Sequence, residues 1–273
     1  MYPPLCICNG LIRSGSTWSF NVCRELMQRL ASHHQRPFGS TYMHSPMLDA
    51  FVTKHWARVP GFTVVKAHEL GPAVMAAVES GNARGVSTFR DPRDCVASDM
   101  VFMGRGFQAS VDRVSFSLEC LRASEMTDNV LMVRYEDMMA DRHNEIRGIA
   151  RHMGINADLS LLSQVDSKTN IESSKQVCQN IKDLTIREVF AIDSHRVDPQ
   201  THLHENHIGN AKIGRWRDEL STEQGEQLTR LFSHWLAKWG YEKQPSAQLS
   251  FGINSVMVGS AVQTGSAAES YRS

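Results

Sequence analysis

The chain has 273 residues, and its 29 Lys and Arg balance its 29 Asp and Glu, so the formal net charge is zero. Non-specific nucleic-acid binders usually carry a basic excess, so neutrality argues against that class and leaves any bound anion to a few placed cations. The 41% apolar and 21% charged residues exclude a disordered or fibrous chain and indicate a folded globular protein.

The length of the apolar runs and the spacing of the cysteines indicate the cellular compartment of the protein. No apolar run reaches the roughly 18 residues that a membrane span needs, and the chain does not open on a basic-then-apolar signal peptide. The six cysteines have no framework spacing and suit a reducing compartment. We therefore expect a cytoplasmic protein without membrane contact, in which Cys6 and Cys8 are buried core thiols rather than a metal pair.

The first unit along the chain is a strand, a tight turn and a helix. Residues 5–12 are apolar, residues 13–17 form a Gly/Ser turn, and apolar residues then recur at helical spacing as far as Leu30. Residues 31–60 show no clean period and are expected to be a loop-rich excursion with one short helix.

Two further strand–helix units follow. Residues 62–66 predict a strand before a helix at 71–80, and residues 85–89 predict a strand before a helix that runs to about Met103. Asp91 is expected to cap that second helix, because Pro follows it at the first helical position.

The remaining elements continue the pattern. A helix is expected around 111–121, a strand at 130–133 and a helix at 141–153. Residues 158–191 are expected to be mostly helical, and residues 192–215 to form a long loop.

A last helix opens with a capping box at Ser221 and ends at Gly240. Repeated strand–helix alternation predicts an α/β fold, a parallel sheet flanked by helices on both faces. We expect one domain over 1–243 and a mostly disordered tail over 244–273. Ligands of such folds bind at the carboxyl ends of the strands.

The turn after the first strand matches a phosphate-binding pattern. Residues 10–17 fit the spacing GxxxxG followed by a hydroxyl pair, between a strand and a helix whose first N–H groups would bind a phosphate. The alternative is an ordinary Gly/Ser turn. Ser16 stands where ATP- and GTP-using loops have Lys. No clean strand ends in an Asp that could bind magnesium, and the nearest candidate is Asp137. Both observations weaken a kinase interpretation.

Two separated motifs carry a family resemblance. Residues 13–18, Arg-Ser-Gly-Ser-Thr-Trp, resemble the Lys-Ser-Gly-Thr-Thr-Trp loop of the PAPS-dependent sulfotransferases. Residues 90–94, Arg-Asp-Pro-Arg-Asp, followed by Ser98, resemble that family's Arg-Asn-Pro-Lys-Asp motif with its Ser.

Three shorter elements extend the likeness over about 5–240. Residues 66–68 resemble a Lys-Thr-His strand end, residues 135–137 match Tyr-Glu-Asp, and residues 214–216 are similar to Gly-Asp-Trp. The resemblance implies a P-loop-like three-layer fold and the transfer of a sulfuryl group from PAPS to a hydroxyl or amine.

The resemblance also implies which residues bind PAPS, which carries a 5′-phosphosulfate and a 3′-phosphate. Trp18 would stack on adenine, and Arg90 with Ser98 would hold the 3′-phosphate. The 5′-phosphate would lie on the loop formed by Arg13, Ser14, Gly15, Ser16 and Thr17. Trp18 as a core side chain and Arg90 as a structural ion-pair partner are the alternatives.

The chemistry of sulfuryl transfer assigns catalytic roles within that frame. His68 is the expected general base, because an imidazole titrates near neutral pH. Arg13 and Lys66 would neutralise the leaving phosphate oxygen, with Arg13 unable to donate a proton. This mechanism requires no metal.

Weaker correspondences concern the nucleoside and the second phosphate. Tyr135 and Thr169 fall where the family has residues near the nucleoside. The family's Arg-Lys-Gly before the late tryptophan is replaced by residues 209–211, Gly-Asn-Ala, so Lys212 is the expected substitute cation.

His202, His204 and His207 form an HxHxxH pattern. It resembles a metal site by spacing alone, and we expect it to be part of a polar loop over the active site, because no carboxylate spacing supports zinc or iron.

Three interpretations remain after the sequence. The leading one is a sulfotransferase acting on a small-molecule or glycan acceptor, with phenol, sterol, sugar and peptide tyrosine all open. The others are a magnesium-dependent P-loop kinase of small molecules and a nucleotide-binding regulatory protein with a decayed site. Residues 31–60, 104–110 and 192–213 are expected to form the acceptor pocket. The oligomeric state is left open.

Overall fold

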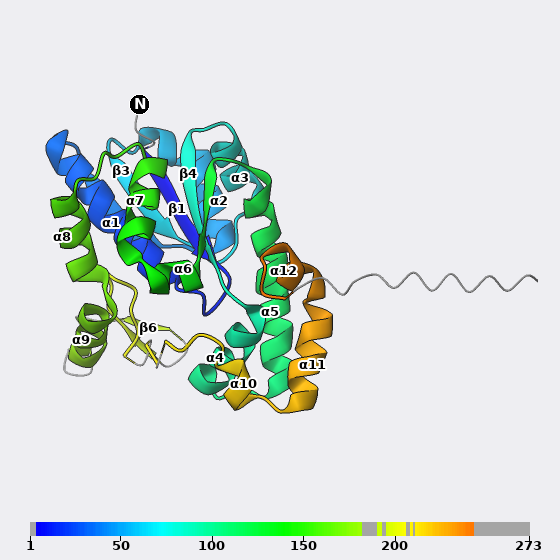
Figure 1. The fold of residues 1–273 in the computed structure, drawn as a ribbon. Coiled ribbons are helices and arrows are strands. Elements are labelled where there is room, and N and C mark those ends of the chain that lie inside the picture. The colour runs from blue at the N-terminus through cyan, green and yellow to red at the C-terminus, as the bar shows by residue number, and fades with distance from the viewer. Residues whose placement is uncertain (1–3, 182–189, 193–194, 206–207, 210, 243–273) are drawn as a thin grey trace, which may run out of the picture.

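A five-stranded parallel sheet forms the centre of the computed structural model, which describes residues 4–181, 190–192, 195–205, 208–209 and 211–242 (Figure 1). The strand order is β2-β3-β1-β4-β5. The strands are β1 (Leu5–Gly10), β2 (Phe38–Tyr42), β3 (Phe62–Lys66), β4 (Ala83–Phe89) and β5 (Val130–Arg134). Helices cover both faces, so the predicted α/β class is confirmed.

The central strands are apolar because both of their faces are covered. Every residue of β1 is buried, and β1 pairs in parallel with β3 on one side and β4 on the other. Gly10 ends β1 where the strands approach closely, since a Cβ there would lie 2.2 Å from the Thr88 hydroxyl oxygen. The first glycine of the phosphate-binding pattern is therefore required by packing.

One face of the sheet is covered by α1 (Ser16–His33), α7 (Arg142–His152) and α8 (Leu159–Thr169). Their apolar side chains pack with the β1 and β3 side chains in one buried cluster that includes Phe20, Leu26 and Ile149.

The other face carries two groups of helices. One is α2 (Ser45–Lys54) with α3 (Pro72–Glu79); the other is α4 (Pro92–Met103), α5 (Phe107–Arg122), α11 (Thr222–Leu231) and α12 (Ser233–Lys238). Figure 1 shows α11 and α12, in orange, alongside α5. None of the described helices is long and apolar enough to cross a membrane.

Shorter elements complete the described chain. They are η1 (Trp56–Arg58), η2 (Ala123–Met126), α6 (Tyr135–Ala140), α9 (Ile171–Ile181), α10 (Trp216–Glu219), and the antiparallel pair β6 (Phe190–Ile192) and β7 (His195–Val197). The predicted caps are confirmed: the Asp91 carboxylate accepts from the Arg93 amide, and Ser221 forms a full capping box with Gln224.

Three predictions of local structure were wrong or incomplete. Residues 31–60 contain the edge strand β2, whose half-buried Phe-Gly-Ser-Thr-Tyr sequence lacks an apolar alternation. The expected loop at 192–215 contains β7, which also bridges to His204. The last helical stripe is broken at Phe232 into α11 and α12. The predicted tail at 244–273 lies outside the described residues.

The strand order places a topological switch at β1. The chain passes from β1 to strands on one side of it and then crosses to β4 on the other side. Crevices for ligands open at such switch points, beyond the carboxyl ends of the strands. In this chain the turn at residues 11–15 lies at that place.

Candidate functional site

A cavity of about 490 Å³ lies at the carboxyl ends of β1, β3 and β4. It brings together most of the residues predicted for the site from distant parts of the sequence. The predicted residues that line it are Arg13, Gly15, Ser16, Thr17, Trp18, Lys66, His68, Arg90, Ser98, Tyr135 and Thr169. Ser14 and Lys212 are predicted residues that do not line it.

The phosphate loop is held in shape from inside the protein. Gly15 is the N-cap of α1 and has a φ of 89°, a conformation that glycine adopts without strain. The fully buried Ser14 hydroxyl lies 2.5 Å from the Leu11 carbonyl oxygen and 2.7 Å from the Thr88 hydroxyl. Ser14 therefore fastens the loop to β4, and its side chain is turned away from the cavity.

Lys66 ends β3 beside the first turn of α1. Its ammonium group donates a hydrogen bond of 2.5 Å to the Thr17 hydroxyl. Burial lowers the pKa of Lys66 to about 8, which still leaves the group mostly charged at neutral pH. A positive charge at a helix N-terminus, where amide groups lack partners, makes a strong site for an anion.

His68 follows Lys66 on the wall of the cavity, 5.8 Å from the Tyr42 ring between centroids. Among the described residues its buried Nδ1 has no hydrogen-bond partner. Burial, with the charges of Lys66 and Arg113, lowers the pKa of His68 to about 3. The expectation of titration near neutral pH was wrong for this site without ligand, because burial keeps the imidazole neutral.

Arg13 contacts two residues of α4. Its Nε donates to the Ser98 hydroxyl at 3.1 Å, and its guanidinium carbon lies 4.0 Å from the centre of the Phe102 ring. Burial lowers the pKa of Arg13 to about 10, against the opposing effect of Asp99 and with help from Arg215.

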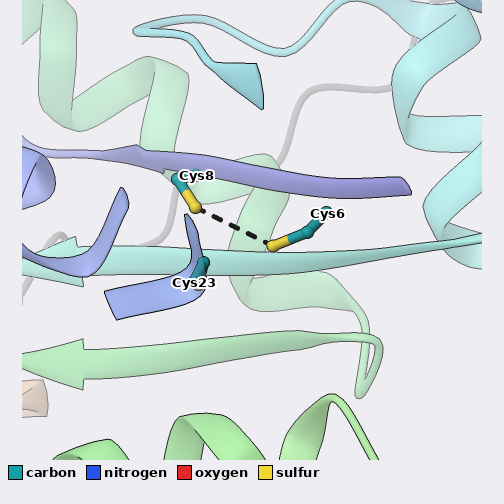
Figure 2. Close-up of side chains that lie close together, drawn as sticks. All are labelled: Cys6, Cys8 and Cys23. Atoms are coloured by element: carbon teal, nitrogen blue, oxygen red, sulfur yellow. Dashed lines mark hydrogen bonds between the residues drawn. The ribbon is translucent and has the colours of Figure 1, made fainter. Parts of the chain in front are cut away.

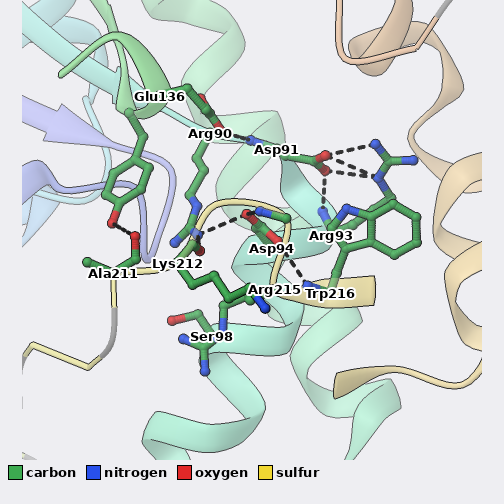
Figure 3. A network of polar contacts seen from close by, with 12 residues as sticks. Arg90, Asp91, Arg93, Asp94, Ser98, Glu136, Ala211, Lys212, Arg215 and Trp216 are labelled. Atoms are coloured by element: carbon green, nitrogen blue, oxygen red, sulfur yellow. Dashed lines mark hydrogen bonds and ion pairs between the residues drawn. The ribbon is translucent and has the colours of Figure 1, made fainter. Parts of the chain in front are cut away.

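Arg90 is held on three sides (Figure 3). Its guanidinium lies 4.2 Å from the centre of the Tyr135 ring, pairs with Asp94 at 2.9 Å and donates to the Lys212 carbonyl at 2.6 Å. Burial acts to lower the pKa of Arg90, but Cys95 and Asp94 outweigh it and raise the pKa. Tyr135 donates to the Ala211 carbonyl at 3.3 Å and so fixes the same segment.

Asp94 joins α4 to residues far along the chain. Its carboxylate accepts from the Gly214 amide at 2.7 Å and from the Trp216 amide at 3.0 Å. This fixes Arg215, between those two residues, at the cavity wall (Figure 3).

The structure brings Arg215, rather than the side chain of Lys212, into the cavity. Lys212 is half-exposed and its ammonium pairs with Asp218 on the surface. Arg215 is buried and pairs with Glu219 at 2.7 Å. Sequence reasoning missed Arg215; the available signal was an Arg in place of the Asp in a Gly-Asp-Trp element.

The remaining predicted residues have distinct places. The Thr169 hydroxyl donates to the Val165 carbonyl at 2.9 Å, and the half-buried Trp18 has an indole N–H without a partner among the described residues. Asp137, the magnesium candidate, is not one of the residues lining the cavity.

His202 and His204 line the cavity as part of the loop that follows β7. The His202 ring packs 4.9 Å from the Phe20 ring, and burial lowers the pKa of His202 to about 4. His207 lies outside the described residues. In the part of the chain that the structure describes, these histidines do not form a metal-ligating group of three.

A family model described as Sulfotransferase domain matches residues 5–240. The chain belongs to the sulfotransferase family. The match contains both motifs and the whole described cavity, which is the region that the sequence resemblance covered. No curated protein sequence matches the chain at a significant level.

Solved structures share the sulfotransferase fold. A retinol dehydratase in complex with retinol and PAP has a TM-score of 0.58 and 17% identity, over 86% of this chain and 82% of that one. The mouse sulfotransferase SULT7A1 complexed with PAP has a TM-score of 0.59 and 15% identity, over 86% of this chain and 85% of that one. At these identities the likeness concerns the fold.

Proposed function

We propose that this sulfotransferase moves a sulfuryl group from PAPS to a hydroxyl or amine of a small acceptor. The observation that carries the proposal is one cavity in which a phosphate loop, Lys66, His68 and buried guanidinium groups meet at the switch point of the sheet. The structural neighbours that contain PAP support the choice of donor.

The residues present fit a nucleotide with two separate phosphates. The loop at 15–17 and the Lys66 ammonium form one anion site at the start of α1. Arg13, Arg90 and Ser98 form a second positively charged site beside the start of α4. Trp18, with a buried indole N–H lacking a described partner, offers a surface for the adenine.

Bound PAPS would supply an activated sulfuryl group as the second substrate. His68 would take the proton of the acceptor hydroxyl at a ring nitrogen, which the neutral imidazole offers as a lone pair. Negative charge brought by the donor would raise the pKa of His68 from about 3 and strengthen it as a base. Lys66 would stabilise the charge that develops on the leaving phosphate oxygen.

The acceptor would be a small molecule with an apolar body. Apolar side chains line part of the cavity, namely those of Phe102, Met103, Phe116 and Ile208. Retinol and androsterone appear with PAP in crystal structures of retinol dehydratase, whose fold is similar. A glycan acceptor is less consistent with this lining, because sugars present many hydroxyls that need polar partners.

The two other interpretations of the sequence lose support. A kinase would need a magnesium ligand at the cavity, and Asp137 does not line it. A decayed site would lack the base or the cations, yet His68 and Lys66 are both buried at the cavity wall. The absence of a metal requirement and a cytoplasmic location stay predictions.

Isothermal titration calorimetry tests the proposal. We expect adenosine 3′,5′-bisphosphate to bind with EDTA present, and ³⁵S from labelled PAPS to be transferred to a panel of apolar alcohols and phenols. Preference for Mg-ATP would contradict the donor assignment. Binding of the bisphosphate without transfer to any acceptor would favour the regulatory interpretation.

A further inference from the structure

Three cysteine side chains meet between β1 and α1 (Figure 2). Cys6 and Cys8 lie on β1, and Cys23 lies on α1, which packs against that strand. All three are fully buried. Their sulfur atoms lie within 4.8 Å of one another, and those of Cys6 and Cys8 are 3.8 Å apart.

The separation of the Cys6 and Cys8 sulfur atoms matches the geometry of a metal bound by sulfur. With metal–sulfur bonds of about 2.3 Å, two thiolates on one ion lie roughly 3.8–4.0 Å apart, whether the arrangement is tetrahedral or trigonal. The pair on β1 already meets this distance. The alternation of side chains along a strand places Cys6 and Cys8 on the same face, and Cys23 closes the third side from α1.

A compensating positive charge lies beside the cluster. Cys8 and Lys66 are direct partners in the parallel pairing of β1 and β3, so their side chains leave the sheet on the same face. The buried Lys66 ammonium is close enough to Cys8 for the two to interact electrostatically. Metal-bound thiolates are negative, and burying them in an apolar core requires such a partner.

We propose that Cys6, Cys8 and Cys23 form a site for a soft monovalent metal ion, Cu(I). Among the described residues no fourth Cys, His, Asp or Glu joins the group, whereas structural zinc is almost always four-coordinate. Thiolate ligands select soft ions such as Cu(I). Binding through two thiolates and one thiol would release two protons to solvent and leave one negative charge, which the Lys66 ammonium balances.

Deep burial determines how the site would be filled and tested. The full chain is unfolded in denaturant and refolded without oxygen, with Cu(I) supplied from a weak chelator, and copper per chain is then measured by mass spectrometry. We expect about one copper in the wild type and less than a tenth of that in Cys23→Ala. X-ray absorption of the loaded wild type should show sulfur neighbours only.

Variants at cysteines outside the cluster test whether copper binds specifically to Cys6, Cys8 and Cys23. Cys178→Ala removes a buried cysteine outside the cluster, and Cys120→Ser removes a partly exposed one; both should keep the copper. Copper should also raise the melting temperature of the wild type and of these two variants, because an ion that binds only the folded state stabilises it. Circular dichroism checks folding, and Cys6→Ala replaces Cys23→Ala if the latter does not refold.

The outcomes are distinct from those that test the proposed function. Copper in the wild type at the level of the cluster variants would overturn the site. Equal loss of copper in Cys178→Ala or Cys120→Ser would overturn it as well. When Zn²⁺ and Cu(I) are both supplied during refolding, uptake of zinc in place of copper would overturn the assignment to Cu(I). Each of these results is independent of whether the chain binds the bisphosphate.

Discussion

The two ends of the cavity are built by different physical means. The cationic end, formed by Arg13, Arg90 and Arg215, carries fixed charges that are positioned by Asp94 and by residues late in the chain. The histidine end is formed by His68, His202 and His204. Burial lowers the pKa of His68 and His202, so these two imidazoles are neutral at physiological pH. Fixed positive charges and neutral imidazoles therefore both lie on the wall of one cavity.

The largest expected effect is at the histidine end. His68→Asn should lower kcat by about 10²–10⁴, the usual contribution of a general base, and change the Kd of the bisphosphate by less than about twofold. Steady-state kinetics and calorimetry measure the two quantities. His202→Asn is the matched control, a buried histidine of the same end, and an equal loss of kcat in both variants would contradict the role of His68.

At the cationic end, a substitution should change the Kd of the bisphosphate more than it changes kcat. Arg90→Ala should weaken the binding of adenosine 3′,5′-bisphosphate by about 100-fold, which corresponds to the loss of strong charged hydrogen bonds. Adenosine 5′-monophosphate is the internal reference and should lose much less affinity in calorimetry. Equal weakening of the two ligands would mean that Arg90 acts on the fold and not on the 3′-phosphate.

The pH dependence of the unfolding free energy should reveal the neutral His68 imidazole in the protein without ligand. The folded pKa of His68, about 3, lies below the unfolded value of 6.5, so the unfolded state binds the proton first as the pH falls. The stability that comes from keeping His68 neutral is therefore fully present above pH 6.5. As the pH falls to 5, the free energy of unfolding should decrease by about 2 kcal/mol through this group. Urea unfolding of wild type and His68→Asn at pH 7.5 and 5 measures this, and parallel losses in both would refute the shift.

The smallest effect compares Arg215 with Lys212. Arg215→Met should weaken bisphosphate binding about tenfold, the loss expected for one charged contact, whereas Lys212→Met should change it by less than about twofold. Titration of both variants decides which side chain supplies the late cation. A larger loss in Lys212→Met would restore the substitute that the sequence suggested.

Sequence reasoning located the parts of the site that are encoded locally. The loop at 13–17 and the helix start at Asp91 follow from glycine, hydroxyl and proline positions within a few residues of each other, and both formed as predicted. Family membership followed from the order of the motifs and the α/β fold from the strand–helix alternation; the family model confirms the first and the sheet topology the second. The domain boundary at 243 and the roles of the site residues remain predictions.

Features that depend on distant contacts were not predictable in the same way. Strand β2 is polar in sequence and becomes a strand only because β3 offers a free edge. The turn of Ser14 away from the cavity depends on Thr88 in β4. Arg215 reaches the site through amides held by Asp94, which lies 120 residues earlier than Gly214.

The hydrogen bonds of Asp94 also determine when the cavity wall can be completed during translation. Asp94 leaves the ribosome 120 residues before Gly214 does, an interval on the order of ten seconds at ordinary rates of synthesis. Until then the Asp94 carboxylate lacks two of its amide donors and the cavity lacks one wall. The turn after β1 is therefore synthesised early, whereas the segment that holds Arg215 at the cavity wall follows much later.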